Sequence, residues 1–500
     1  MTNIATDLTT TAAKNPEQSA IRINGQSMSY AQLHGAAAKV AGSLRAAGIE
    51  PGDRVAIILP NVPAFPVVFY GILLAGGVVV PMNPLLKSGE IDYFFTNSGA
   101  KIAFVWPDFV AEATKGAENS GTTIVECTPM GPVEGALPVG DPIVEPVERA
   151  DDDDALILYT SGTTGRPKGA ELTHSNIHLN AQRSSLDIQH TTAEDVVMGC
   201  LPLFHVFGLV VGMHAAVLAG ASLALIPRFD PEQAIEVIEK ERVTIMLGVP
   251  TMYAAILNHP KSDGMDASSL RTCCSGGSAM PHEVQKAFED KFGCIILEGY
   301  GLSETSPVAS FNMPDRERKP GTIGVAIPGC EMKLVGADGQ DVGAGEGVGE
   351  IAIRGDNVMK GYWQNPEATA EAIPDGWFRT GDLATVDEDG YYTIVDRKKD
   401  MILRGGMNVY PREVEETLYQ HPDVLEAAVV AVPDDLLGEE VGAAVALKPD
   451  AQASVEDIQQ FVKDNLAAYK YPRHIWQVEE LPKTATGKIL RREVSKPADA

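Results

Sequence analysis

The chain has 500 residues, which suggests two to four domains at about 150 residues each. Its formal net charge is −28, from 40 basic and 68 acidic side chains, and this argues against nucleic acid and anionic membrane surfaces as partners. The six cysteines follow no disulfide or metal-ligand spacing, and the N-terminus lacks the basic and apolar regions of a signal peptide. We therefore expect a reduced, cytoplasmic protein.

Two uncharged stretches, residues 55–86 and 201–227, are long enough to resemble membrane spans. Glycine and proline interrupt both of them, for example at Pro66, Gly76 and Gly208. Because such breaks are typical of a buried helix followed by a buried strand, no membrane span is expected.

Predicted strands and helices alternate along the first three hundred residues. Near the N-terminus, apolar runs at 20–23 and 27–30 flank Asn24-Gly25, a strong hairpin signal. The later strands are continuous apolar runs, as expected for parallel strands covered on both faces. These strands are predicted at residues 55–59, 78–80, 102–105, 155–159, 221–226, 244–249, 270–274 and 295–297. Helices are predicted at residues 31–45, 64–74, 90–96, 231–242, 252–258 and 283–292.

This alternation predicts an α/β fold made of two doubly wound α/β halves. After Gly321, short strands with Asp-Gly turns indicate a small β-barrel-like subdomain that ends near Val395. A compact α+β region follows it. Its helices are predicted at 411–419 and 455–466, and its strands at 426–432 and 441–447. We expect a large N-terminal domain, residues 1–398, and a small C-terminal domain, residues 399–500.

The segment 159–169 reads Y-T-S-G-T-T-G-R-P-K-G and has the composition of a phosphate-binding loop. Its glycines let backbone N–H groups converge on an anion, and its hydroxyls and lysine add donors and a positive charge. The spacing differs from that of the P-loop, G-x-x-x-x-G-K-[ST]. We prefer a distinct phosphate loop to a flexible linker, because apolar runs flank the segment. The candidate phosphate ligands are Thr160, Ser161, Gly162, Thr163, Thr164, Gly165 and Lys168.

Two further segments follow predicted strands, where open α/β sheets bind their ligands. In E-G-Y-G-L-S-E-T, residues 298–305, Tyr300 offers a flat face for an adenine and Glu304 an oxygen ligand for Mg²⁺. The alternative for Glu304 is a structural carboxylate that caps a turn. The segment S-G-G-S-A-M-P, residues 275–281, either lines a nucleotide or acyl slot or is a simple strand-to-helix turn.

Two charged segments lie closer to the C-terminus. In W-F-R-T-G-D-L, residues 377–383, Asp382 could accept hydrogen bonds from a ribose, and Arg397 follows as a fixed cation. A surface salt bridge is the alternative for Arg397. In P-K-T-A-T-G-K-I-L-R-R-E, residues 482–493, Lys488 follows a glycine and is free to reach outward. Spacing alone does not distinguish a reactive lysine here from a basic, solubilising tail.

In this order and spacing, the five segments closely resemble those of the adenylate-forming superfamily, which includes acyl-CoA synthetases, luciferases and peptide-synthetase adenylation domains. The resemblance covers nearly the whole chain. The pairing of L-P-L-F-H-V-F-G at residues 201–208 with V-P-T-M-Y at residues 249–253 is most similar to fatty-acid and aryl-acid CoA ligases. The resemblance implies ATP, Mg²⁺ and coenzyme A as cofactors. It also implies two steps, in which ATP converts a carboxylic acid to an acyl-adenylate and the coenzyme A thiol then displaces AMP.

The resemblance assigns roles to individual residues. Lys488 would bridge the acyl carboxylate and the α-phosphate, with His205 and Glu304 as further catalytic residues, and Glu304 with Thr160 would hold the metal. Ser303 stands where most relatives have threonine and keeps the hydroxyl. The other implied ATP or AMP ligands are Gly276, Gly277, Ser278, Glu298, Gly299, Tyr300, Gly301, Ser303, Asp382 and Arg397.

The same resemblance implies a mobile C-terminal domain. Lys399 occupies the hinge position, about which this domain would swing after adenylation, withdrawing Lys488. Gly405 and Gly406 would then line the path of the coenzyme A thiol. An exposed residue in a basic run is the alternative for Lys399.

The implied acyl pocket consists of His205, Val206, Gly208, Val249, Met252, Gly276 and Gly301. No aspartate lies between Cys200 and Arg228 to hold an amino acid's ammonium group, and Arg228 lies past the pocket segment. We therefore expect an apolar monocarboxylic acid, with a medium- to long-chain fatty acid first and an aryl acid second. A luciferase-like oxygenase and a non-catalytic acyl-AMP binding module are less favoured functions. The oligomeric state stays open, and a homodimer is compatible with the sequence.

Overall fold

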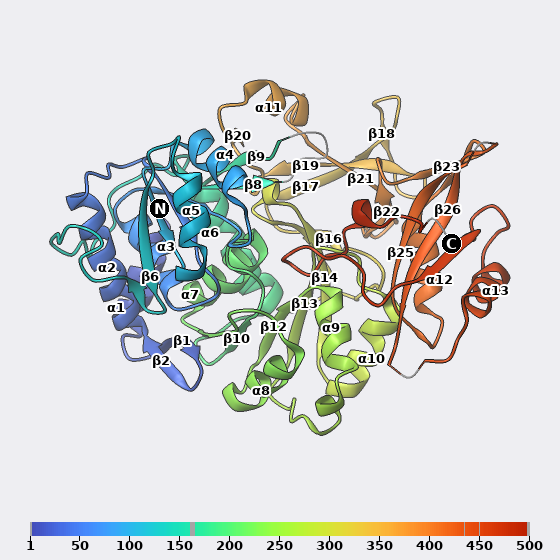
Figure 1. The fold of residues 1–500 in the computed structure, drawn as a ribbon, viewed down its shortest axis with the longest axis horizontal. Coiled ribbons are helices and arrows are strands. Elements are labelled where there is room, and N and C mark those ends of the chain that lie inside the picture. The colour runs from blue at the N-terminus through green and yellow to red at the C-terminus, as the bar shows by residue number, and fades with distance from the viewer. Residues whose placement is uncertain (1–2, 161–165, 435, 450, 498–500) are drawn as a thin grey trace.

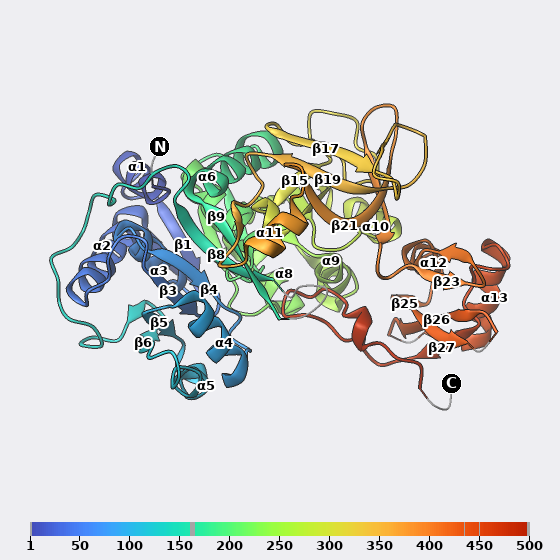
Figure 2. The ribbon, with the colours of Figure 1, turned by 90° about the horizontal axis from the view of Figure 1, so that it is seen from above.

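The computed structural model describes residues 3–160, 166–434, 436–449 and 451–497 (Figure 1). A large N-terminal domain contains two mixed sheets and a β subdomain, and a smaller C-terminal domain lies at the opposite end of the molecule from α1 (Figures 1 and 2). The tail that follows residue 477 extends from the C-terminal domain toward the two large sheets and then turns back in both views.

The first large sheet has eight strands and carries the phosphate-loop segment. In spatial order they are β20 (Gly361–Tyr362), β9 (Lys168–Thr173), β8 (Asp154–Thr160), β4 (Val78–Pro81), β3 (Arg54–Ile58), β5 (Ile102–Val105), β6 (Thr123–Thr128) and β7 (Gly131–Pro132). Alternate residues of β3 belong to two different core clusters, Val55 and Ile57 to one, Ala56 and Ile58 to the other. Both faces of this strand are thus buried, as its continuous apolar run predicts.

The strands β3 to β6 are connected by the helices α3 (Ala64–Leu74), α4 (Ser88–Ser98) and α5 (Val110–Gly116), and α2 (Tyr30–Ala46) packs on α3. Ser29 caps α2, its hydroxyl accepting the Gln32 N–H while the Gln32 side chain accepts the Ser29 N–H. All eleven residues of α3 are buried, which explains why this part of the chain resembles a membrane span. None of the described helices combines the length and apolar character that a bilayer crossing requires.

The second large sheet has nine strands. In spatial order they are β16 (Val325–Ala326), β15 (Val308–Phe311), β14 (Ile295–Gly301), β13 (Thr272–Ser275), β12 (Ile245–Gly248), β10 (Val196–Gly199), β11 (Ser222–Leu225), β1 (Ser19–Ile23) and β2 (Gln26–Ser29). Helices α8 (Pro231–Glu241), α9 (Pro250–Leu257) and α10 (His282–Phe292) connect its strands. The predicted N-terminal hairpin is confirmed, with positive φ at Asn24 and Gly25, and it forms the edge of this sheet because β1 pairs with β11.

The β subdomain is a five-stranded antiparallel sheet, as expected for a β-rich region with Asp-Gly turns. Its strands in order are β18 (Asp341–Val342), β17 (Cys330–Val335), β19 (Gly349–Gly355), β21 (Phe378–Val386) and β22 (Tyr392–Arg397). Among the described residues no pairing joins β18 to β22, so the sheet is open rather than a closed barrel. Helix α11 (Pro366–Ala372) precedes β21.

The C-terminal domain packs two helices, α12 (Pro411–Tyr419) and α13 (Val455–Asn465), on a separate sheet with its own core. The strands of this sheet are β24 (Met407–Val409), β23 (Ile402–Arg404), β26 (Gly438–Leu447), β25 (Val424–Asp434) and β27 (His474–Gln477). Leu481 packs with Trp476 in a small cluster of this domain, and Ile489 and Val494 pack against that cluster. The tail is therefore anchored to its own domain on both sides of Lys488.

Helix α1 (Ala5–Lys14) is tied to the N-terminal domain by a buried carboxylate. Asp7 Oδ2 accepts hydrogen bonds from His178 Nδ1 (2.8 Å), on α6 (His174–Arg183), and from His214 Nε2 (3.0 Å), at the end of the π-helical segment η3 (Phe207–His214). The other nitrogen of His214 lies 2.8 Å from Tyr70 Oη. Within the described residues, one group of three His, Cys, Asp or Glu side chains lies close enough together to hold a metal ion, and it consists of Asp7, His178 and His214. These side chains already bond one another. We interpret them as a structural tie.

All six cysteines are buried and free, in agreement with the expected reduced core thiols.

Candidate active site

The described ends of the phosphate-loop segment lie on β8 and β9, next to the edge strand β20 of the eight-stranded sheet. Strands β8 and β9 are antiparallel, and Thr160 pairs with Lys168 at their ends. The Tyr93 hydroxyl on α4 donates to the Pro167 carbonyl (2.8 Å), and the Arg166 guanidinium lies 5.5 Å from the Tyr93 ring centre. The predicted ligands Ser161, Gly162, Thr163, Thr164 and Gly165 lie outside the described residues.

Glu304 lies beside this hairpin, where the sequence predicts a metal site. It belongs to the short 3-10 turn η5 (Ser303–Thr305) directly after β14, and its side chain is buried. Glu304 Oε1 accepts hydrogen bonds from Thr160 Oγ1 (3.3 Å) and from the Tyr362 hydroxyl (2.9 Å). The structure thus brings together the two predicted metal ligands, although 144 residues separate them in the chain. Ser303 is half-buried next to Glu304.

Tyr362 was not predicted, yet it connects two predicted ligands. Besides its bond to Glu304, its ring centre lies 5.1 Å from Lys168 Nζ. Burial and the nearby Glu304 charge raise the pKa of Tyr362, so it stays a neutral donor. Tyr362 reaches the site because β20 pairs with β9, a contact between distant segments that no local motif announces.

A second group contains the predicted adenine and ribose residues. The Tyr300 hydroxyl donates to Asp382 Oδ2 (2.6 Å), and Arg397 Nε lies 3.2 Å from Asp382 Oδ1. Asp382 and Arg397 face each other across β21 and β22, whereas Tyr300 comes from β14. The pKa of Tyr300 is raised by burial and by the Asp382 carboxylate, so its phenol donates at neutral pH. The large sheet and the β subdomain meet at this carboxylate.

The segment Gly276, Gly277 and Ser278 follows β13 and lies next to β14, because Ser275 pairs with Glu298. The Glu298 carboxylate lies below this segment, where Oε1 accepts the Met280 N–H (3.0 Å). Burial raises the pKa of Glu298 to about 7. Glu298 therefore stabilises the loop after β13 through its buried hydrogen bond to Met280. Its predicted contact with a nucleotide stays a prediction.

Gly299 and Gly301 have a packing reason that the sequence did not reveal. A Cβ at Gly299 would overlap the ring of Phe311, and one at Gly301 would overlap the Pro307 carbonyl. The protein itself fills the space beside both glycines. Both glycines thus hold β14 against β15 and the chain before it.

Lys488 reaches this site from the C-terminal domain. The turn that carries it is closed by the Gly487 N–H, which donates to the Thr484 carbonyl (2.9 Å), and it docks on α9 through Thr251 Oγ1, which donates to the Gly487 carbonyl (2.9 Å). Burial, followed by the charge of Arg397, lowers the pKa of Lys488 to about 8. Within the described residues no carboxylate forms an ion pair with its ammonium group. The lysine is thus half-buried, close to Arg397 and Asp382, and available to an anionic ligand.

Two of the predicted acyl residues, Val249 and His205, lie next to the Lys488 turn. Val249, at the start of α9, lies between Gly277 and Gly487, within 3.4 Å and 3.0 Å of the positions that their Cβ atoms would take. His205 Nδ1 accepts the Phe207 N–H (3.3 Å), and burial together with the charge of Lys488 lowers the pKa of His205 to about 4. His205 is therefore a neutral imidazole at pH 7. Val206 and Met252 are buried nearby in the core, whereas Gly208 is required because a Cβ there would overlap the Pro202 carbonyl.

The predicted hinge and coenzyme A residues belong to two exposed turns. Lys399 is exposed in the turn after β22, where the Asp400 N–H donates to the Arg397 carbonyl (3.0 Å). Gly405 and Gly406 form the exposed turn between β23 and β24, with φ of 56° and 82°. In this arrangement the structure brings Lys488, and not the glycine turn, to the nucleotide residues.

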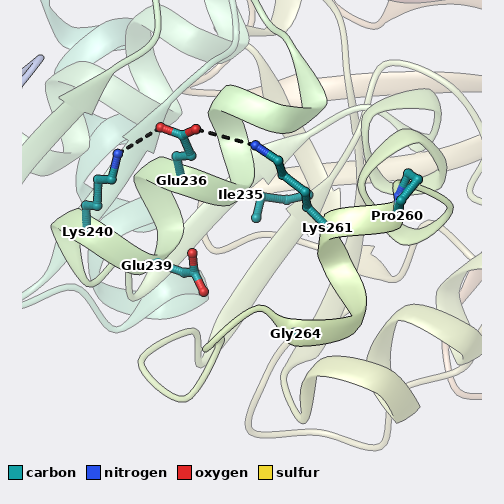
Figure 3. A pocket seen from close by; sticks show the side chains of 7 residues that line it. All are labelled: Ile235, Glu236, Glu239, Lys240, Pro260, Lys261 and Gly264. Carbon is teal, nitrogen blue, oxygen red and sulfur yellow. Dashed lines mark hydrogen bonds and ion pairs between the residues drawn. The ribbon is translucent and has the colours of Figure 1, made fainter.

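A hollow of about 500 Å³ lies elsewhere, between α8 and the turn of residues 260–264 (Figure 3). Glu236 lies between Lys240 and Lys261, at 2.8 Å and 3.9 Å, and Glu239 accepts the Asp266 N–H. Because these charged groups already bond to the protein, we assign no ligand to this hollow.

Comparison with known proteins agrees with this geometry. The AMP-binding enzyme family matches residues 8–363, and the AMP-binding enzyme C-terminal domain matches residues 413–488. The long-chain-fatty-acid–CoA ligase of Bacillus subtilis (strain 168) is 37% identical, over 97% of this chain and 93% of that protein. The feruloyl-CoA synthase of an Amycolatopsis species is 40% identical, over 97% of this chain and 96% of that protein.

Among solved structures, ATP-bound MatB from Rhodopseudomonas palustris superposes with a TM-score of 0.90 at 33% identity, and the match covers 98% of both chains. Both domains, the nucleotide residues and the relatives lead to the same family. The chain belongs to the AMP-binding enzymes and is an AMP-forming acid–CoA ligase, whose substrates are ATP, a carboxylic acid and coenzyme A.

Proposed function

We propose that the enzyme activates an apolar monocarboxylic acid, most favourably a medium- to long-chain fatty acid, and that Lys488 is the catalytic group of the first step. The observation that carries this proposal is the position of Lys488. Its side chain comes from the C-terminal domain and is half-buried, its turn docks on α9 of the N-terminal domain, and its charge helps to lower the pKa of His205. A positive charge at this point would stabilise the negative charge that develops as a carboxylate attacks the α-phosphate.

The surrounding residues would hold ATP for that attack. Thr160 and Lys168, at the ends of the β8–β9 hairpin, would contact the β- and γ-phosphates, with the intervening loop. Asp382 and Arg397 would bind the ribose, and Tyr300 would support the adenine beside the 276–278 segment. A carboxylate is a poor nucleophile that polyphosphate repels, so these fixed contacts contribute mainly by alignment and charge neutralisation.

Mg²⁺ fits the donors present. Thr160 Oγ1 and Glu304 Oε1 are hard oxygen ligands 3.3 Å apart, and the Tyr362 hydroxyl orients the carboxylate. When bound, the ion would supply charge neutralisation at the phosphates.

For the second step we propose a boundary and hinge at Lys399, with rotation of the C-terminal domain about it. The exposed Gly405-Gly406 turn would then replace Lys488 at the site and leave room for the coenzyme A thiol. The thiol attacks the acyl carbonyl, the C–O bond to AMP breaks, and AMP leaves with that electron pair.

The acid class rests on the apolar surroundings of His205. Val206, Phe207, Val249 and Met252 are buried aliphatic or aromatic side chains, and the described segment 200–227 contains no acidic or basic residue besides His205 and His214. A fatty acid suits this lining, and one relative is a long-chain-fatty-acid–CoA ligase. An aryl acid is the second candidate, because a relative of 40% identity is a feruloyl-CoA synthase.

The role of Lys488 is tested by separating the two half-reactions. We expect Lys488→Ala to abolish pyrophosphate release from ATP and acid while thioester formation from supplied acyl-adenylate continues. Equal loss of both half-reactions would contradict the assigned role.

The acid is identified by coenzyme A-dependent AMP formation across fatty acids of graded length, benzoate, ferulate, indoleacetate and dicarboxylates. Greatest kcat/KM on a fatty acid of medium to long chain supports the first choice, and greatest kcat/KM on an aryl acid replaces it with the second. AMP without thioester would point to an oxygenase, and binding without AMP to a non-catalytic module.

A further inference from the structure

The basic tail contains two adjacent arginines in very different surroundings. Both belong to η6 (Arg491–Glu493), three and four residues after Lys488. The Arg491 side chain is 27% exposed and contacts three carboxylates, whereas that of Arg492 is 71% exposed and has a single 4.0 Å contact with Glu493. A solubilising role describes Arg492 but leaves Arg491 unexplained.

Two of the carboxylates on Arg491 accept direct hydrogen bonds. Arg491 Nε donates to Glu415 Oε1 (2.9 Å) and Nη2 donates to Glu415 Oε2, a two-bond contact with α12 of the same domain. Nη1 donates to Asp396 Oδ1 (3.1 Å), and Asp400 Oδ2 lies 3.8 Å from it. The guanidinium therefore links the tail to both sides of the proposed hinge at Lys399.

Of the three carboxylates on Arg491, Asp396 lies next to the proposed ribose-binding residues. It is 3% exposed, and its second oxygen accepts the Arg412 N–H at the start of α12 (3.0 Å). In β22 it pairs with Leu383, directly beside the Asp382–Arg397 pair proposed to bind ribose. A buried carboxylate needs such partners, since losing one leaves a charge poorly compensated.

Arg491 lies three residues after Lys488, and backbone hydrogen bonds hold the tail in which both residues lie. The Leu490 N–H donates to the Pro482 carbonyl (2.8 Å), and the Lys488 N–H donates to Thr484 Oγ1 (3.1 Å), so the tail between Pro482 and Arg491 folds back on itself. Fixing Arg491 on Asp396 therefore fixes where the Lys488 turn lies relative to the nucleotide residues.

We propose that Arg491 is a positioning residue for acyl-adenylate formation, which holds Lys488 in place through the buried Asp396. The inference rests on the proposed role of Lys488. Glu415 and Arg491 belong to the same domain and would move together, whereas Asp396 lies before the hinge. Rotation would thus break the Asp396 contact and keep the Glu415 contact, so Arg491 acts in the first step and not in the second.

The test compares Arg491→Gln with the matched control Arg492→Gln in both half-reactions. We expect Arg491→Gln to lower kcat of pyrophosphate release about 100-fold, as for a misplacement of about 1 Å, with a smaller change in KM for ATP. Thioester formation from supplied acyl-adenylate should stay at the wild-type rate or rise. Arg492→Gln should change neither. Asp396→Asn should act like Arg491→Gln, and the double variant should lose little more than either single one.

Thioester formation by the same preparation shows that Arg491→Gln is folded. Equal loss of both half-reactions, or loss in neither, overturns the inference. Lys488→Ala, measured in parallel, separates the two proposals. If Lys488→Ala affects only the first step and Arg491→Gln affects both steps or neither, the inference on Arg491 fails while the proposed function stands. If Lys488→Ala reduces both half-reactions equally, the proposed role of Lys488, on which the inference rests, is wrong.

Discussion

At the scale of single residues, the environment of Lys488 decides at which pH it can work. An exposed lysine has a pKa near 10.4, but enclosure in the site and the neighbouring Arg397 lower the pKa of Lys488 to about 8. At neutral pH the ammonium form still predominates. The charge on which the proposed first-step role of Lys488 depends is therefore lost just above the physiological range.

We predict that kcat/KM of pyrophosphate release falls as pH rises through about 8, approaching tenfold per pH unit above it, because Lys488 loses its charge there. The pH dependence of kcat/KM reports the pKa of groups in the free enzyme. Lys488→Arg should be slower at pH 7 but lack this decline, since a guanidinium keeps its charge. The measurement is the initial rate without coenzyme A, whose thiol titrates in the same range. A flat wild-type profile up to pH 10 would refute the prediction.

Tyr362 provides a second prediction. In Tyr362→Phe the ring beside Lys168 remains, but Glu304 loses a hydrogen-bond donor. We therefore expect the enzyme to need more Mg²⁺ for the same rate, because the apparent affinity for the ion falls about 10- to 100-fold. Titration of pyrophosphate release with Mg²⁺ measures this effect.

Tyr391→Phe is the matched control for Tyr362→Phe. Tyr391 also donates its hydroxyl, to the Glu317 carbonyl, and its ring centre also lies 4.5 Å from a lysine nitrogen, that of Lys319. An equal effect of both substitutions on the Mg²⁺ dependence would mean that Tyr362 acts through general packing.

At the scale of elements, those with clear ends in the sequence were predictable. Helices α3 and α12 have the predicted bounds, because proline or continuous apolar character marks their extent. The residues of the phosphate hairpin and β14 were recognisable from glycine-rich strings. By contrast, β20, which carries Tyr362, is two residues long and pairs with a strand far away in the chain. Short edge strands have no periodicity of their own, so this part of the site was not predictable.

The tie of α1 gives a prediction at this scale. Asp7→Ala leaves His178 and His214 without their acceptor, at a cost of about 1–3 kcal/mol for each buried group left unsatisfied. Thermal and urea unfolding measure the loss, with the exposed Glu17→Ala as control. A wild-type-like stability of Asp7→Ala would show that the tie contributes nothing.

The same tie depends on pH. Although burial alone would raise it, the hydrogen bonds from His178 and His214 lower the pKa of Asp7 below its ordinary value of about 3.9. The stabilisation is therefore present above about pH 4 and is lost as pH falls through the folded-state pKa. The difference in stability between wild type and Asp7→Ala should shrink in that acidic range.

At the scale of the whole molecule, the α/β class, the β-rich subdomain and the small last domain were predictable from the change of texture along the chain. The arrangement of the two large sheets was not, because β1 and β2 join a sheet whose other strands begin almost two hundred residues later. The proximity of Lys488 to Asp382 and Arg397 likewise depends on how the domains meet, which no local spacing encodes.

The proposed rotation yields the last prediction. Lys399→Pro restricts the backbone at the proposed hinge, so we expect adenylation to persist while thioester formation slows strongly. Lys399→Ala removes the charge but keeps backbone freedom, and it should retain both half-reactions. Thioester formation by Lys399→Pro at the wild-type rate would exclude a hinge at this residue.

Because Lys488 lies on a tail, its position also affects how proteolysis would inactivate the enzyme. Ala485, three residues before the lysine, is exposed, whereas the large sheets and their core are formed without any residue of the tail. A protease that cuts at Ala485 would break the covalent link between Lys488 and the rest of the chain while the large sheets stay folded. The tail would then be held only by non-covalent contacts, such as those of Ile489 and Arg491. Release of the tail would remove the lysine of the proposed first step and leave the proposed nucleotide residues in place, so a single cleavage would yield a chain expected to bind ATP without activating an acid.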